Sequence, residues 1–208
     1  MRKLTLSLLA LMMTFSCNEG PTLSYKYGSN PDMFECDYEK MDLIKEALYA
    51  FEDYIFQHHN FKGPETLERV YANYWSIAMS DRLPFIDKFD DHLKAVAREV
   101  LAQEDLWIMT NGKMTLNLYD DLGNCIIENF QNEDLKETME ALVETKTFRS
   151  DIFVPTVRRK TMQLLKDKAM ATYVALDLFY GKLHGMDLDN TENNPVPKPE
   201  DHSGHNHD

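Results

Sequence analysis

Apolar residues recur at spacings of three and four through most of residues 35–185, and this periodicity most limits the folds available to the chain. An α-helix turns once in 3.6 residues, so such spacings place apolar side chains on one helix face. The clearest stripe predicts an amphipathic helix that ends near His59, and it consists of Met41, Ile44, Leu48, Phe51 and Ile55. Gly63 and Pro64 then end the pattern.

Similar stripes predict further helices, separated by short turns that contain proline, glycine or helix-capping residues. We expect them to cover residues 64–79, 85–101, 115–130, 132–143 and 150–183. Asn132 is suited to cap the helix that follows it. The last helix would be the longest, and the others would pack against it. Short connections favour antiparallel neighbours, so the sequence predicts an all-α domain, residues 35–185, built as an antiparallel bundle of about five or six helices.

The stretch LWIMTNGKMTLNLY, residues 106–119, has two interpretations. Asn111-Gly112 between apolar runs is a strong hairpin signal, because both residue types tolerate a positive φ. Alternatively, Gly112 ends one helix and a new helix starts near Thr115. We favour the second interpretation, because Leu118, Leu122 and Ile126 keep helical spacing afterwards. A short hairpin near residues 106–119 remains the alternative.

The two flanks of the helical region lack apolar periodicity. Residues 17–34 contain glycine, proline, serine and asparagine and are expected to form a tether. Residues 186–208 are rich in Asp, Asn, Pro and His and are expected to form a disordered acidic tail. A single folded domain of about 150 residues is long enough to bury one core.

The first sixteen residues have the composition of an export signal. Arg2 and Lys3 precede an apolar run from Leu4 to Phe15, which is too short to remain as a membrane-spanning helix. Removing residues 1–16 would leave 20 basic and 35 acidic residues, a formal net charge of −15. A chain this acidic repels phosphate backbones, so nucleic acid is excluded as an expected partner.

The signal ends in Thr14-Phe15-Ser16-Cys17, a small residue followed directly by cysteine. This segment resembles the lipobox of bacterial lipoproteins, although Thr14 and the bulky Phe15 depart from the usual pattern. The resemblance implies that Cys17 carries the lipid, palmitate among its acyl chains, and anchors the protein in the cell envelope. Asn18 rather than Asp after the cysteine implies the outer membrane over the inner membrane. Two or three acyl chains give stable anchoring.

Cys36 and Cys125 are the cysteines that remain after Cys17. An even pair in an oxidising envelope compartment is readily oxidised to a disulfide, and two buried free thiols are the alternative. The sequence therefore leaves the bonding state of this pair open.

Templates for catalysis are absent from the sequence. None of the seven histidines follows a glutamate by three residues, as di-iron bundles require, and C-x-x-C-H, H-E-x-x-H, G-x-S-x-G and phosphate-binding glycine motifs are missing. We therefore expect a non-catalytic protein. The mature helical region resembles no family that we recognise.

The C-terminal stretch DHSGHNHD contains His202, His205 and His207. Neutral imidazole is a common ligand of zinc, copper and nickel, so the tail is a candidate metal site, with a solvated tail as the simpler interpretation. Two main functional hypotheses follow, and an enzyme whose site cannot be recognised from linear spacing is a third. The chain is either an envelope lipoprotein whose helical domain binds a protein partner, with a surface groove expected around Tyr71, Tyr74 and Trp75, or a lipoprotein that binds and delivers a divalent metal.

Overall fold

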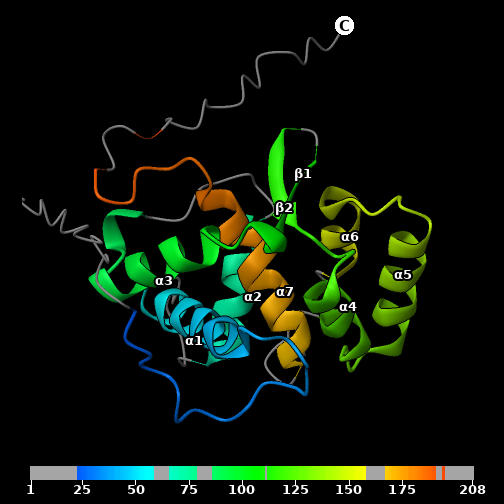
Figure 1. Cartoon of the computed structure of the whole chain (residues 1–208), viewed down its shortest axis with the longest axis horizontal. Helices are drawn as coiled ribbons and strands as arrows, with labels where there is room; N and C mark the ends of the chain where they lie inside the picture. Colours follow the sequence, from blue (N-terminus) through cyan, green and yellow to red (C-terminus); the bar gives the residue numbers. More distant parts are fainter. Residues whose placement is uncertain are drawn as a thin grey trace, which may run out of the picture.

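The computed structural model of the chain describes residues 23–58, 66–78, 86–110, 112–157, 167–190 and 194. Within these ranges the chain is mostly helical and contains a two-stranded antiparallel sheet. The expectation of a mainly helical fold is confirmed, whereas the expectation of a purely α-helical one is wrong. The described α-helices (Figure 1) are α1 (Met41–His58), α2 (Leu67–Ala78), α3 (Asp91–Leu101), α4 (Asp121–Glu128), α5 (Glu133–Glu144), α6 (Ser150–Val157) and α7 (Lys168–Leu178).

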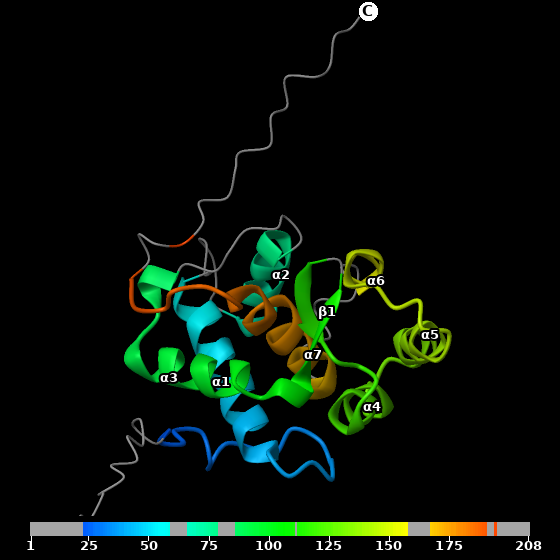
Figure 2. The same ribbon diagram turned by 45° about the horizontal axis from the view of Figure 1, so that its top comes forward.

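Helix α7 lies at the centre of the molecule (Figures 1 and 2). Every residue from Ala169 to Leu178 is buried, so this helix is covered on all sides. It contacts α1 and α4 directly, and α1 in turn contacts α2 and α3. A helix that is apolar all round has no solvent face, which explains why α7 lacks the clear amphipathic stripe of its neighbours.

The helices α1, α2 and α7 meet in an aromatic cluster. The ring of Phe179, just after α7, lies 5.2 Å from the rings of Phe51 and Tyr54 and 5.5 Å from that of Phe89. Tyr74 joins from α2, with its ring 5.0 Å from Phe51. These tilted and edge-to-face pairs are typical of aromatic cores.

The predicted groove around Tyr71, Tyr74 and Trp75 is therefore wrong. All three side chains are at most 2% exposed, because the face of α2 that carries them packs against α1. Tyr74 donates its hydroxyl hydrogen bond to the Leu178 carbonyl at 2.9 Å. Aromatic spacing on one helix face predicts burial as readily as it predicts a binding surface.

Residues 106–119 form a hairpin, so the favoured interpretation of two helices is wrong. Strand β1 (Trp107–Thr110) pairs with β2 (Lys113–Leu116), with Trp107 opposite Leu116. Gly112 has φ +76°, as the turn requires. Contacts outside the hairpin hold the strands in place. Trp107 donates from Nε1 to the Val100 carbonyl at 3.1 Å, and Leu116 donates from its backbone N–H to Asp177, 61 residues away, at 2.8 Å.

The predicted single helix over residues 150–183 is also wrong, because α7 starts afresh at Lys168. The Asp167 carboxylate caps this start by accepting from the Met170 N–H at 2.9 Å. It also accepts from the Gln131 N–H at 2.8 Å, between α4 and α5. Helices α6 and α7 are separate elements that contact each other, since the ring of Phe153 on α6 lies 5.8 Å from that of Tyr173 on α7. The predicted cap at Asn132 is confirmed, since its side chain accepts from the Leu135 N–H at 3.1 Å.

The described parts of the two flanks, residues 23–34 and 186–190, pack on the domain. Residues 23–34, here called the N-terminal segment, pack on the domain instead of forming part of a free tether: Tyr27 is buried, and Leu23 and Phe34 contact the core. At the other end, Leu188 is 7% exposed, and Asp189 pairs with Arg98 at 2.6 Å. Isolated apolar residues in these polar stretches give no periodic signal, which is why sequence patterning missed them.

Gly123 permits a close backbone contact at the start of α4. A Cβ atom at this position would lie 2.5 Å from both the Asn117 carbonyl oxygen and the Leu118 Cα. Because backbone atoms cannot move aside cheaply, we expect Gly123→Ala to lower the free energy of unfolding by about 2 to 3 kcal/mol, as overpacking typically does. Urea denaturation measures this loss. Gly28→Ala is the matched control, since nothing lies within 4 Å of the position that its new methyl group would occupy, and an equal effect of both changes would contradict the packing argument.

Candidate functional site

A small polar pocket lies where the N-terminal segment meets α1 and α3. Its lining includes the side chains of Tyr27, Asp53, Tyr54, His58, Asp90 and His92. The volume of the pocket is about 30 Å³, close to the share of one water molecule in the liquid. Pockets for organic ligands are about ten times larger, so this one has room for water or a small ion only.

The buried carboxylate of Glu46 organises the polar groups beside this pocket. Glu46 is 1% exposed. Its Oε1 accepts from the Lys26 backbone N–H at 2.6 Å, and its Oε2 accepts from the Tyr27 backbone N–H at 2.9 Å. His92 Nε2, on α3, lies 2.8 Å from Oε1, at ion-pair distance. One carboxylate on α1 therefore holds two consecutive backbone amides, an arrangement that we call the Glu46 clamp.

The side chain of Tyr27 strengthens the attachment of the same segment. Its hydroxyl donates a short hydrogen bond to Asp53, and its ring meets that of His92 edge-on at 5.9 Å. Burial, followed by the hydrogen bond to Asp53, raises the pKa of Tyr27 to about 12. The hydroxyl therefore stays protonated and donates throughout the neutral pH range.

A second buried carboxylate, Glu52, joins three helices. It accepts from Lys168 at 2.7 and 2.9 Å through its two oxygens, and from the Tyr71 hydroxyl at 2.9 Å. Lys168 Nζ also lies 5.0 Å from the centre of the Tyr49 ring. A buried ion pair of this kind fixes the relative positions of α1, α2 and α7, because separating the two charges would leave one of them unpaired.

Asp177, on the central helix, is a further buried carboxylate. It accepts from the Leu116 N–H at 2.8 Å, from Ser150 Oγ at 2.5 Å and from the Tyr173 hydroxyl at 3.0 Å. Burial raises its pKa above the usual value of 3.8, and the hydrogen bonds from Ser150 and Leu116 act in the opposite direction. This group ties the hairpin and α6 to α7.

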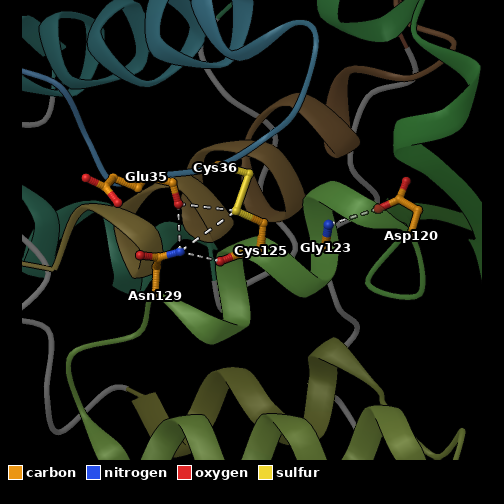
Figure 3. The surroundings of a disulfide bond; sticks show 6 residues. All are labelled: Glu35, Cys36, Asp120, Gly123, Cys125 and Asn129. Atoms are coloured by element: carbon orange, nitrogen blue, oxygen red, sulfur yellow. Dashed lines mark hydrogen bonds between the residues drawn. A yellow bond between two sulfur atoms is a disulfide. The ribbon is translucent and has the colours of Figure 1, made fainter.

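The structure joins Cys36 and Cys125 in a disulfide (Figure 3), with their Cα atoms 5.9 Å apart. The bond connects the chain just before α1 to α4. Asn129, one turn after Cys125, donates from Nδ2 to the Glu35 carbonyl at 3.1 Å and to the Cys125 carbonyl at 2.9 Å. The chain after the N-terminal segment is thus held by a covalent bond and by a hydrogen bond next to it.

The other predicted site residues, Cys17, His202, His205 and His207, lie outside the described residues. Among the residues that the structure describes, no group of three or more His, Cys, Asp and Glu side chains is arranged to hold a metal ion. In the same part of the chain, no helix is both long and apolar enough to cross a membrane.

Sequence reasoning missed the buried carboxylates Glu46, Glu52, Asp167 and Asp177. Glu46 offered a weak signal, because Leu43 and Ala50, three and four residues away, are its neighbours on the helix surface and imply that it borders the buried face. Asp177 likewise stands in an apolar run. Their partners are remote in sequence, at separations of 19 and 20 residues for Glu46 and 61 for Leu116 and Asp177, and no local pattern predicts such pairings.

The described polar groups are therefore arranged to fasten segments together, and the pocket is too small for an organic substrate. Comparison with known proteins adds no family to this picture: no family model matches the chain, and no curated protein or solved structure is significantly similar to it.

Proposed function

We propose that this chain is a lipid-anchored protein of the bacterial cell envelope. In this proposal, acylated Cys17 anchors the protein in the outer membrane. In this proposal the helical domain is a non-catalytic binding or structural module that acts through a protein partner. The observation that carries the proposal is the lipobox-like sequence that ends an export signal at Cys17. The Cys36–Cys125 disulfide supports it, because such bonds persist in oxidising compartments outside the cytosol.

Lipidation is tested by incorporation of labelled palmitate when the whole chain is expressed in a bacterial host. We expect the native chain to be labelled and to fractionate with membranes, and Cys17→Ser to lose both properties, because the acyl chains supply the anchoring free energy. The matched control replaces Cys36 and Cys125 with serine and should keep the label. Membrane association of the Cys17→Ser chain without label would contradict the proposal.

The second candidate function is binding and delivery of a divalent metal, and the specific observation that favours it is the trio His202, His205 and His207 within six residues. A protein comprising residues 18–208 is expected to bind zinc, copper or nickel in calorimetric titration, with one metal preferred. A version ending at Pro199 is expected to lose that binding, because it lacks all three imidazoles. Equal metal binding by the two proteins would show that the tail histidines are not the metal site.

A further inference from the structure

The Glu46 clamp determines how much chain separates the proposed lipid from the folded domain. Glu46 holds the backbone amides of Lys26 and Tyr27. These residues lie close to residue 23, where the described chain starts. Only nine peptide steps lie between Cys17 and Lys26, and a fully extended chain spans at most about 3.6 Å per residue. The connection can therefore reach about 30 Å at most, far less than a tether that runs to residue 34 would allow.

This reach is smaller than the path around the domain. A domain of 150 residues has a radius of gyration near 15 Å and hence a diameter of roughly 40 Å. A connection of about 30 Å cannot pass around half of that circumference, so only the side from which the N-terminal segment leaves can approach the lipid surface. Figures 1 and 2 show this segment below α1, with the hairpin β1–β2 on the other side of α1.

We propose that the Glu46 clamp orients the domain on the membrane, with the face around residues 23–28 toward the lipid surface and the hairpin β1–β2 away from it. This proposal rests on the proposed lipidation of Cys17. Tyr25, 51% exposed beside the clamp, has the amphipathic side chain that suits the headgroup region. Met109, 60% exposed on the hairpin, is then presented to the compartment instead of the bilayer.

Releasing the clamp lengthens the connection in a predictable way. When Glu46 is replaced by alanine, the two amides lose their carboxylate acceptor, so the segment detaches more often, although the hydrogen bond from Tyr27 to Asp53 still favours attachment. While the segment is detached, the disulfide at Cys36 is the fixed point of the chain. Nineteen peptide steps then separate Cys17 from the fixed point, a reach of about 65 Å. That length is enough for other faces of the domain to approach the lipid surface.

The orientation is measured by energy transfer on the lipidated full-length mature chain, bound to phosphatidylethanolamine and phosphatidylglycerol vesicles with acceptor-labelled headgroups. A donor dye is attached at Asp42→Cys, on the first turn of α1 and electrostatically coupled to Tyr25, or at Met109→Cys on the hairpin. We expect clearly stronger transfer from position 42 than from position 109. Equal transfer from the two positions in the otherwise native chain would overturn the proposal.

Two further variants test the cause of the orientation. Glu46→Ala should reduce the difference in transfer between the two positions, and so should insertion of ten Gly and Ser residues after Gly20, which leaves the folded domain untouched. The insertion keeps the test decisive if Glu46→Ala does not fold. A difference that survives the insertion would show that the short connection does not set the orientation.

Hydrogen exchange separates failure of the clamp from failure of lipidation. In mature Cys17→Ser protein without lipid, we expect the Lys26 and Tyr27 amides to exchange roughly ten- to hundredfold more slowly than in the same protein with Glu46→Ala, as hydrogen bonds to a charged acceptor predict. Equal exchange rates would reject the clamp even if Cys17 is acylated. Slow exchange together with absent palmitate labelling would reject the lipid anchor and, with it, the membrane orientation.

Discussion

Replacing Cys36 and Cys125 together with serine is expected to lower the free energy of unfolding by about 4 to 5 kcal/mol. The bond spans 89 residues of sequence, and closing a loop of that length removes much of the conformational entropy of the unfolded chain. For a domain of this size the melting temperature should fall by roughly 10 to 15 °C. Differential scanning calorimetry of the native and substituted proteins measures both quantities.

The comparison needs a cysteine control and a chemical control. Cys17→Ser should melt as the native protein does, because Cys17 takes no part in this bond, and a reductant should lower the melting temperature of the native protein but not that of the double-serine variant. Each single substitution should match the double one, since either breaks the same crosslink. Two titratable thiols in the unreduced mature Cys17→Ser protein would contradict the disulfide.

Truncating Asp177 to alanine is expected to cost about 3 kcal/mol or more at neutral pH. The side chain accepts hydrogen bonds from Leu116, Ser150 and Tyr173 inside the protein, and each buried donor left without an acceptor costs about 1 to 3 kcal/mol. Asp177→Asn should cost much less, because its amide keeps an acceptor oxygen and the two hydroxyl groups can rotate to accept from its NH₂. Urea denaturation at pH 7 distinguishes the two variants.

The raised pKa of Asp177 predicts how the free energy of unfolding changes with pH. Burial raises its pKa in the folded state above the usual 3.8, so the folded protein holds this proton more tightly than the unfolded chain. Its contribution to the free energy of unfolding therefore falls as the pH rises from about 3.8 through the folded-state pKa.

Asp177→Asn removes that contribution. Relative to the native protein, we expect the asparagine variant to gain stability between pH 4 and pH 7, as measured by urea denaturation at both values. Asp37→Asn, at an exposed position, is the control and should show no such gain. If Asp177→Asn instead lost stability relative to the native protein between pH 4 and pH 7, the expected direction of the pH dependence would be wrong.

Features that depend on a few neighbouring residues could be predicted from the sequence. Helix α1 follows from its apolar stripe, α5 starts where Asn132 can cap it, and the hairpin turn has its signal in Asn111-Gly112, although helical spacing after Thr115 outweighed that signal. Periodicity and capping act over one or two turns, so these properties are already present in a short peptide. The export segment and the candidate lipid site at Cys17 are likewise read from contiguous residues.

Tertiary structure decided the features that depend on remote partners. Leu116 pairs with Asp177 across 61 residues and helps to select the hairpin, and Asp167 starts α7 while binding the Gln131 amide 36 residues away. The Glu46 clamp binds a segment that carries no periodic signal of its own. A buried carboxylate needs enough hydrogen-bond donors to offset its desolvation, and only the folded chain brings those donors together. The sequence therefore determined which helices and turns could form. The packing around Glu46, Glu52 and Asp177 decided how these elements are joined.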